Sequence, residues 1–408
     1  MALSKPVLII GGGISGLALA QALKKQGIPY RIFERDAGPD HRSQGWSITL
    51  HFCLEPLKNS IDPILYETLP AKASVNPRDP QIEFALVDGQ SLETLVRFDQ
   101  QAQFVSYRIN RVRFRQWLLT GIDMEWNKLF QSYDVNEHGV TVTFKDGTKV
   151  EGSLLVGADG VNSGVCRQLV GSEQFSNTTT LNPLRILGAS RWVDKETYEI
   201  YRPFASTQIL SHGRLENGEV VRLFITVNDI SEDGERYEML WALSRYDPKD
   251  LLPHENTSEG RLKQAKDWSN AFRGVLRQLI WDTPSDTLVT DLKIRERSPS
   301  EDIRSNSGDG RVTLVGDAAH TMTMSRGEGG NHAILDSTML VAQLAEVNQG
   351  KKSLSDAVDT YLDEMIPRGS KAVLESHQAA EMGHEHPDRV VEMLKSRVKE
   401  YMLKVNNK

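Results

Sequence analysis

The 408-residue sequence has few cysteines, no long apolar run and no excess of basic charge. Two cysteines cannot form the disulfide framework of a secreted domain, and the apolar N-terminal segment lacks a signal-peptide cleavage pattern. We therefore expect a cytoplasmic protein. No apolar run approaches the roughly 18 residues that a membrane-spanning helix needs, so we expect no integral membrane segment. The net charge of −7, with both signs interspersed, offers no basic surface for nucleic acid.

A metal centre is not expected either. His384 and His386 are close together, but they lie in a polar helical tail that we expect to be exposed. With 39% hydrophobic and 25% charged residues, the composition is that of an ordinary globular protein, and the length favours a two-domain enzyme.

The N-terminal segment follows the pattern of a dinucleotide-binding βαβ unit. The apolar run Val7–Ile10 predicts a buried parallel strand, and Ile14–Lys25 predicts the helix that follows it. A glycine-rich turn joins them, and Tyr30–Phe33 predicts a second strand that ends at Glu34. The strand, the helix and the acid about 20 residues on make this motif more specific than a glycine-rich turn alone.

Three glycines of this turn have different tasks in dinucleotide binding. Gly11 permits the tight turn, Gly13 lets backbone N–H groups approach a pyrophosphate, and Gly16 lets the helix pack closely on the strand. The helix N-terminus then presents its positive end to the phosphates. Glu34 can accept hydrogen bonds from ribose hydroxyls.

Two later segments repeat the order of strand, acid, glycine and helix. In Leu154–Arg167 the strand leads to a D-G motif, Asp159–Gly160. In Val312–Asp336 it leads to a G-D motif, Gly316–Asp317. Ligands of α/β sheets bind at such carboxyl ends of strands, so both motifs are candidates for the same site.

Taken together, these motifs resemble the single-component (group A) FAD-dependent aromatic monooxygenases of the p-hydroxybenzoate hydroxylase type, in particular their fungal secondary-metabolite members. The resemblance spans about residues 6–370, and a helix start at Arg111–Phe114 adds a fourth motif. It implies an oxidoreductase that uses FAD, NADPH or NADH, and O2. The implied reaction is hydroxylation or epoxidation of a small aromatic, alkaloid, polyketide or terpenoid substrate through a flavin C4a-hydroperoxide.

The resemblance also implies a mixed α/β (α+β) fold. Residues 184–244 predict antiparallel strands, and the pattern from residue 331 onward is helical, with breaks at Pro367–Gly369 and at His386–Pro387. We expect a Rossmann-like FAD-binding domain with an inserted antiparallel-sheet substrate domain and a helical C-terminus. The expected ranges are 1–75, 100–175 and 300–345 for the FAD domain, 76–99 and 176–299 for the substrate domain, and 346–408 for the helical region.

The resemblance assigns cofactor contacts residue by residue. Asp317 is similar to the residue that binds the FAD ribityl chain, Asp159 to the acid that serves FAD and the NAD(P)H pyrophosphate, and Arg111 to a flavin-contacting arginine. Arg42 would face the pyrophosphate. The full expected set is Gly11, Gly13, Ile14, Ser15, Gly16, Glu34, Arg35, Arg42, Gly45, Arg111, Asp159, Gly160, Gly316, Asp317, Gly327, Gly329, Gly330 and Asn331.

The segment after the G-D motif departs from the family in two places. Gly327–Asn331 resembles the loop whose N–H groups face the flavin, but Glu328 stands where a glutamine is usual. An ionised Glu328 beside an anionic flavin would be unfavourable, so we expect it to be paired or to point away. Thr321–Met324 replaces a segment with two prolines, which frees the backbone there.

Candidates for substrate chemistry are weaker. Arg191, Tyr201 and His212 in the expected second sheet, and His51 in the N-terminal half, could bind or activate a phenolate. The sequence favours a surface or interdomain ion pair for Arg191, and ordinary hydrogen-bonded side chains for His212 and His51, over catalytic roles.

Two other kinds of function remain open from the sequence. A related flavin reductase or halogenase would use the same cofactor, although the W-x-W-x-I-P signature of halogenases is absent. A non-catalytic FAD-binding protein is the third, and the intact Gly11, Asp159 and Asp317 argue against it. We expect a small-molecule substrate and a monomer or homodimer.

Overall fold

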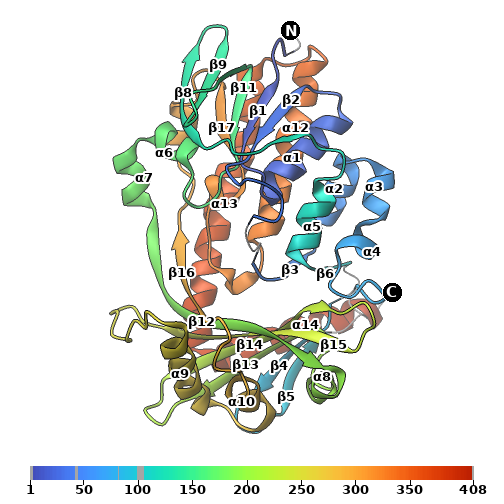
Figure 1. Ribbon diagram of the computed structural model, residues 1–408, viewed down its shortest axis with the longest axis vertical. Coiled ribbons are helices and arrows are strands. Elements are labelled where there is room, and N and C mark those ends of the chain that lie inside the picture. The colour runs from blue at the N-terminus through green and yellow to red at the C-terminus, as the bar shows by residue number, and fades with distance from the viewer. Residues whose placement is uncertain (1–2, 42–44, 81, 99–104, 407–408) are drawn as a thin grey trace. The chain divides into compact units, whose positions relative to one another are not determined.

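The computed structural model describes residues 3–41, 45–80, 82–98 and 105–406 of the chain (Figure 1). The chain forms two compact units, each assembled from segments that lie far apart in the sequence. Unit 1 comprises Met1–Ala73, Arg111–Leu181 and Arg295–His377. Unit 2 comprises Ser74–Asn110, Asn182–Ile294 and Gln378–Lys408. The C-terminal residues 346–408 are thus divided between the two units.

Unit 1 is organised around a five-stranded sheet in the order β17-β11-β1-β2-β7. All four pairings are parallel, and every residue of β1 and β11 is buried. Strands covered on both faces need apolar side chains throughout, which is why these two form continuous apolar runs. The strands are β1 (Val7–Ile10), β2 (Tyr30–Phe33), β7 (Met124–Glu125), β11 (Leu154–Gly157) and β17 (Val312–Leu314).

Two helices of unit 1 pack extensively against each other. α1 (Ile14–Lys25) follows β1 directly and packs along α12 (Gly329–Asn348). A separate antiparallel sheet contains β8 (Phe130–Asn136), β9 (Gly139–Phe144) and β10 (Lys149–Gly152). The other elements are α2 (Leu54–Ser60), α3 (Pro63–Glu67), α4 (Leu69–Ala73), α5 (Arg111–Leu118), α6 (Gly164–Val170), α7 (Ser172–Thr178), α11 (Asp302–Ser305), β3 (Ile48–Leu50) and two 3-10 turns, Gly316–Ala318 and Met324–Arg326.

Unit 2 contains a seven-stranded sheet in the order β16-β12-β15-β14-β13-β4-β5. The central pairings are antiparallel, as the sequence predicts, and the pairing of β13 with β4 is parallel. The strands are β4 (Phe84–Asp88), β5 (Thr94–Phe98), β12 (Thr180–Asp194), β13 (Gln208–Arg214), β14 (Val220–Ile230), β15 (Arg236–Tyr246) and β16 (Thr290–Glu296). The remaining elements are β6 (Tyr107–Ile109), α8 (Lys195–Tyr201), α9 (Ser258–Trp268), the 3-10 turn Ser269–Ala271, α10 (Gly274–Trp281) and α14 (Pro387–Asn406).

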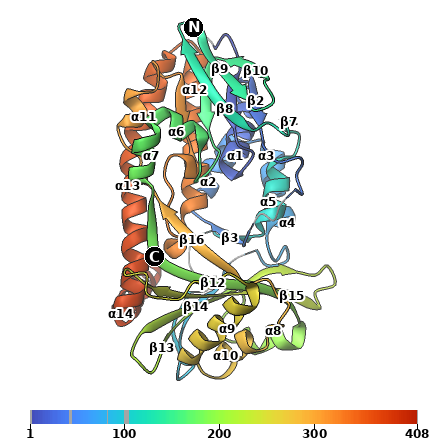
Figure 2. The same ribbon diagram turned by 60° about the vertical axis from the view of Figure 1, so that its left-hand side comes forward.

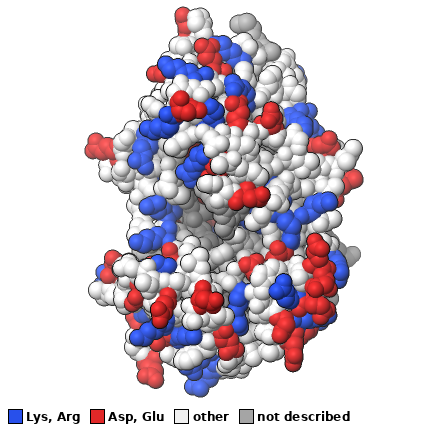
Figure 3. Space-filling view, in the orientation of Figure 1, with Lys and Arg blue, Asp and Glu red and all other residues white. Residues whose placement is uncertain are grey.

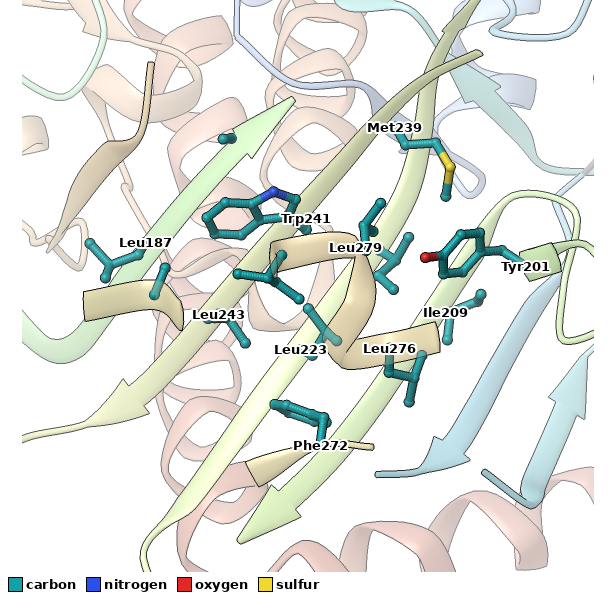
Figure 4. Packing of buried hydrophobic residues seen from close by; sticks show 14 of the residues in the cluster. Leu187, Tyr201, Ile209, Leu223, Met239, Trp241, Leu243, Phe272, Leu276 and Leu279 are labelled. Atoms are coloured by element: carbon teal, nitrogen blue, oxygen red, sulfur yellow. The ribbon is translucent and has the colours of Figure 1, made fainter. Parts of the chain in front are cut away.

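The hydrophobic core of unit 2 lies on one face of this sheet. Side chains from alternate positions of the strands point toward α10, where Leu279 lies near Trp241 and Leu276 lies near Ile209 (Figure 4). The indole N–H of Trp241 donates to the Thr283 hydroxyl at 2.9 Å, so its polar atom is satisfied inside the core. Because successive side chains of a strand point to opposite faces, the residues between these core positions lie on the other face of the sheet.

The C-terminal helices differ from the sequence prediction in one place. The expected break at Pro367–Gly369 is wrong, because α13 runs without interruption from Leu354 to Glu385 (Figure 2). The break at His386–Pro387 is confirmed, since α14 begins at Pro387, where a missing N–H costs nothing. None of the described helices is long and apolar enough to cross a membrane. Figure 3 shows acidic and basic side chains interspersed over the face in view.

His384 also lies in a different environment from the exposed one expected. It is buried in unit 2, where Nδ1 lies 2.6 Å from the carbonyl of Ala380 and Nε2 lies 2.9 Å from the hydroxyl of Ser244. The carbonyl can only accept, so Nδ1 carries a proton. Burial, with Arg222 nearby, lowers the pKa of His384 to about 3.

This burial predicts a loss of stability in mild acid. The unfolded chain binds a proton at this histidine below about pH 6.5, whereas the folded chain does so only near pH 3, so the free energy of unfolding falls as the pH drops between these values. His384→Gln should remove about 2 kcal/mol of the loss between pH 7 and pH 5 in urea unfolding curves. The same substitution at the exposed His138 is the control. Equal pH dependence of the His384 variant and wild type would contradict the prediction.

Candidate cofactor site

The glycine-rich turn of unit 1 has the geometry that its spacing predicts. Gly11 has a φ of +112°, and a Cβ there would collide with the carbonyl of Ala158. A Cβ at Gly16 would collide with the carbonyl of Gly11. By contrast, nothing lies within 4 Å of a Cβ at Gly13, the N-cap residue of α1. Two glycines therefore serve packing, and the third leaves open space at a helix N-terminus that would attract a pyrophosphate.

Glu34 faces this turn. Its carboxylate is buried and accepts from the backbone N–H of Gly12 at 2.7 Å and of Asp36 at 3.1 Å. A carboxylate has about four acceptor sites, so capacity for a ribose hydroxyl remains. The neighbouring Arg35 is exposed.

Arginines of α5 support the same turn. Arg115, which the sequence analysis did not single out, donates to the carbonyls of Gly12 and Pro39, both at 2.9 Å. Arg111 lies close to Gly45: a Cβ at that glycine, whose φ is +82°, would be 3.3 Å from Nη1 of Arg111. The third expected arginine, Arg42, lies outside the described residues.

The D-G motif caps the start of α6. The carboxylate of Asp159 accepts from the N–H groups of Gly164 at 2.7 Å and Val165 at 3.3 Å, and from the hydroxyl of Ser163. Burial raises the pKa of Asp159, and these donors act against the rise. Gly160 has a φ of +79°, the left-handed conformation that favours glycine.

The G-D motif is held between α1 and α12. Gly316 has a φ of +62°, and a Cβ there would be 3.0 Å from the Ser15 hydroxyl and 3.1 Å from Cβ of Ala333. Its N–H donates to Asp336 at 2.7 Å. The next side chain, Asp317, is exposed. An exposed acid on a tightly packed turn fits the expected contact with a ribityl chain.

Arg297 connects the two motifs, and the sequence analysis missed it. One nitrogen of its guanidinium, Nη1, donates to the Val161 carbonyl at 3.3 Å and the Thr179 hydroxyl at 3.0 Å. The other, Nη2, donates to the carbonyls of Asp317 and Ala318, both at 3.0 Å. Only 3% of Arg297 is exposed. A buried fork of this kind fixes the distance between the D-G and G-D motifs.

The first turn of α12 is joined to β3. The amide of Asn331 accepts from the His51 N–H at 2.8 Å and donates to the Thr49 carbonyl at 2.9 Å. Asn331 thus holds the two segments together through its side chain. Gly327 has a φ of +67°, and a Cβ at Gly330 would be 3.4 Å from Ile48. These two glycines, together with Gly329, keep this backbone accessible at the start of a 20-residue helix.

These features fit an adenine dinucleotide cofactor with a flavin. The open helix N-terminus at Gly13 suits the pyrophosphate, Glu34 the ribose, and Asp317 the ribityl chain. The positive end of α12 suits an anionic reduced flavin. Among the described residues, no group of three or more His, Cys, Asp or Glu could hold a metal ion.

Comparison with known proteins identifies the family. The FAD binding domain family matches residues 114–376, and the NAD(P)-binding Rossmann-like domain family matches residues 9–46. The chain is 31% identical to the FAD-dependent monooxygenase thnD of Trichoderma harzianum over 379 residues, which cover 90% of this chain and 91% of that one. It is 33% identical to the FAD-dependent monooxygenase dbaB of Emericella nidulans over 392 residues, 92% and 95% of the two chains.

The chain belongs to the FAD-dependent monooxygenases. Its fold is also that of a solved structure, Klebsiella pneumoniae HpxO complexed with FAD and uric acid, with a TM-score of 0.72 at 20% identity, covering 97% of this chain and 93% of that one. The protein is therefore an FAD-dependent oxidoreductase with a Rossmann-like fold, as the sequence motifs predict.

The monooxygenase compensates for Glu328. Nε and Nη2 of Arg326 donate to the two carboxylate oxygens at 2.9 Å, and Nη1 of Arg326 lies 2.9 Å from Glu375. Burial acts to raise the pKa of Glu328, but His332 and Arg326 outweigh it and hold the pKa at about 2. Glu328 is therefore ionised and paired, which confirms the expectation from the sequence.

Threonines take over the role of the missing prolines in this monooxygenase. The N–H of Thr321 donates to the Arg297 carbonyl at 3.2 Å, a bond that a proline could not form. The hydroxyl of Thr323 donates to the Ser376 carbonyl at 2.9 Å. Hydrogen bonds rather than proline rings therefore hold Thr321–Met324 in place.

The structure does not bring the four candidates for substrate chemistry together in one unit. His51 lies in unit 1, where burial lowers its pKa although Glu328 acts to raise it. The other three lie in unit 2. Burial, then Arg222, lowers the pKa of His212 well below its usual value.

Two of the unit 2 candidates have structural partners on the helical side of the sheet. Arg191 donates to the carbonyl of Asp282 at 2.9 Å. Tyr201 is part of the hydrophobic core, and its hydroxyl donates to the carbonyl of Val275 at 2.9 Å. Burial raises the pKa of Tyr201 to about 12, so it stays protonated. These contacts favour the structural interpretation, and a catalytic role for either residue stays a prediction.

Proposed function

We propose that this monooxygenase uses NADPH or NADH and O2 to hydroxylate or epoxidise a small aromatic compound or secondary metabolite. The observation that carries the proposal is that the glycine-rich turn, the D-G motif and the G-D motif all lie in unit 1, where Arg297 bonds to segments beside the last two. When bound at these residues, FAD would supply the redox chemistry of the reaction, in which the nicotinamide is the reductant, one oxygen atom of O2 enters the product and the other leaves as water.

The residues of this chain would bind the cofactor and stabilise its charge. Backbone N–H groups near Gly13 and the positive end of α1 would bind the pyrophosphate. The N-terminus of α12, beginning at Gly329, would stabilise negative charge on the reduced flavin ring. Because Arg326 neutralises Glu328, the loop adds no uncompensated negative charge.

A polar, oxygenated substrate is supported by two observations. The sheet face opposite the hydrophobic core carries hydrogen-bonding side chains: Gln208 and Thr226 are paired across β13 and β14, and Ser190 donates to Glu238 at 2.6 Å. HpxO, which has the same fold, is solved with uric acid, an oxygenated heteroaromatic compound. We extend the proposal to a cytoplasmic enzyme that acts as a monomer or homodimer.

The proposal predicts oxygen insertion that depends on both substrate and nicotinamide. Purified holoenzyme would be incubated with NADPH or NADH, with 18O2, and with a panel of phenols and indoles. One panel member should accelerate flavin reduction by about tenfold or more and yield a product heavier by one 18O atom. Mass spectrometry of the products is the measurement, and heat-inactivated holoenzyme is the control. NAD(P)H oxidation without 18O in any product would favour a reductase, and no oxidation at all would favour a non-catalytic flavoprotein.

A further inference from the structure

A network of buried charges lies behind the flavin motifs of unit 1. Its centre is Asp336 on α12, a side chain with no exposed surface. One oxygen, Oδ2, lies 2.7 Å from both the Gly316 N–H and Nε2 of His320. The other, Oδ1, accepts from Nη2 of Arg368 at 2.6 Å. Burial opposes ionisation of Asp336, but His320 and Arg368 hold its pKa at about 2, so the carboxylate is charged.

Arg368 is the residue through which α13 enters this network. Besides Asp336, it binds Glu364 through Nε at 2.6 Å and Nη2 at 2.9 Å. Its Nη1 lies 3.0 Å from Nδ1 of His332 in the first turn of α12. Arginine can only donate, so Nδ1 of His332 carries a lone pair and the proton of the neutral ring is on Nε2. An arginine of α13 therefore fixes the tautomer of a histidine beside the flavin loop.

The residues next to Arg368 fit this arrangement. A Cβ at Gly369 would be 2.9 Å from Cδ2 of His320, so a larger residue would push that ring away from Asp336. α13 continues through Pro367, and Arg368 is therefore carried by a regular helix rather than by a loop. The sequence Pro367–Gly369 predicts a helix break. In the structure it instead places the charged side chain of Arg368 beside the point where the backbone at Gly369 packs closely against His320.

We propose that Arg368 is a positioning residue for the flavin. Through Asp336 it holds the G-D motif, and through His332 it holds the first turn of α12. These two segments contribute Asp317 and the helix N-terminus to the cofactor site. Nε2 of His332 lies 3.8 Å from Oε2 of Glu328, so the network reaches the paired glutamate as well. This role of Arg368 rests on the proposed binding of FAD in unit 1 and does not depend on the identity of the substrate.

Arg368→Met tests this role in the full-length holoenzyme. We expect the dissociation constant of FAD to rise by about tenfold or more, because the two segments lose their common support. The flavin midpoint potential should become more negative, because Asp336 is left without the cation that offsets its charge. Fluorescence titration of apoprotein with FAD and dye-equilibrated reduction measure these two quantities. Neither requires a substrate, so failure of the proposed reaction would not be mistaken for failure of this inference.

Arg304→Met is the matched control. Arg304 of α11 also anchors α13, with Nη1 at 3.1 Å from Asp359 and Nη2 at 2.7 Å from Asp363, and these ion-pair partners lie outside the flavin loops. Arg304→Met should leave the FAD dissociation constant within about twofold of wild type. If Arg368→Met behaves like Arg304→Met, with lower thermal stability but unchanged flavin affinity and potential, Arg368 is merely structural and the proposal is overturned.

A second variant covers the case in which Arg368→Met does not fold. Arg368→Met combined with Asp336→Asn removes both charges and leaves no buried carboxylate without a counter-ion. We expect this double variant to bind FAD weakly, since the support is still missing, while its midpoint potential returns toward the wild-type value. Wild-type FAD affinity in the double variant would overturn the proposal.

Discussion

We expect Gly13→Glu to give a folded protein that does not retain FAD. The space around a Cβ at this position is open to 4 Å, so the backbone and its neighbours need not move. The new carboxylate would stand at the N-cap of α1, where the pyrophosphate has to bind. Repulsion between like charges a few ångströms apart near a protein surface amounts to about 3 kcal/mol, or roughly 100-fold in affinity. The flavin-to-protein absorbance ratio of the purified protein and an FAD titration measure the loss.

Two variants separate charge from shape at this turn. Gly13→Ala adds an uncharged methyl group to the space in which the pyrophosphate would bind, and it should weaken FAD binding less than Gly13→Glu does. Gly16→Ala places a Cβ against the carbonyl of Gly11 and should lose stability as well as flavin. A yellow Gly13→Glu protein with full flavin occupancy would show that the pyrophosphate does not bind at this helix N-terminus.

Arg297→Met is expected to destabilise the folded protein by about 3 kcal/mol, because one buried and three partly buried acceptors lose their donors at once. Val161 follows the D-G motif directly, and Asp317 and Ala318 lie in and next to the G-D motif, so the separation of the motifs would no longer be fixed. The guanidinium also lies 4.5 Å from the ring centroid of Phe175, a cation–π contact that methionine cannot replace. Urea unfolding measures the loss of stability, and FAD titration the loss of cofactor.

Arg295→Met provides the matched control for this prediction. It makes the same substitution two residues earlier, at an exposed arginine that donates to Asn162 at 3.0 Å. An exposed change of this kind should stay within about 0.5 kcal/mol of wild type. Arg297→Lys keeps the charge but not the fork of donors, and we expect it to recover only part of the stability. Equal unfolding free energies for Arg297→Met and Arg295→Met would refute the role given to Arg297.

The sequence predicted those parts of the site that are built from a few residues close together in the chain. The turn between β1 and α1 contains its own strand, glycines and helix start, and Glu34 follows at a fixed distance. Asp159 and Gly316 each stand directly after a buried strand of the same parallel sheet. Because such strands end at one edge of the sheet, their motifs could be assigned to one site without knowledge of the rest.

The parts that were missed depend on contacts between distant segments. Arg297 binds Val161 and Thr179, more than 100 residues earlier in the chain, and nothing in its own neighbourhood indicates this. Arg115 supports Gly12 from the helix whose start, Arg111–Phe114, was predicted from the sequence without any role for Arg115. Long-range polar pairing leaves no periodic signal, so a lone arginine in a sequence has no visible partner.

The same reason explains where local signals were misleading. Pro367 and Gly369 break helices in isolation, yet packing of α13 around Asp336 and His320 keeps the helix continuous. His384 has polar sequence neighbours, yet the sheet of unit 2 buries it against Ser244. The sequence by itself determined the parallel sheet, the glycine turn and the identity of the cofactor, because these rest on spacing within short segments. Only the tertiary structure decided which charges neutralise one another around the flavin loops, because that depends on which distant segments the fold brings within hydrogen-bonding distance.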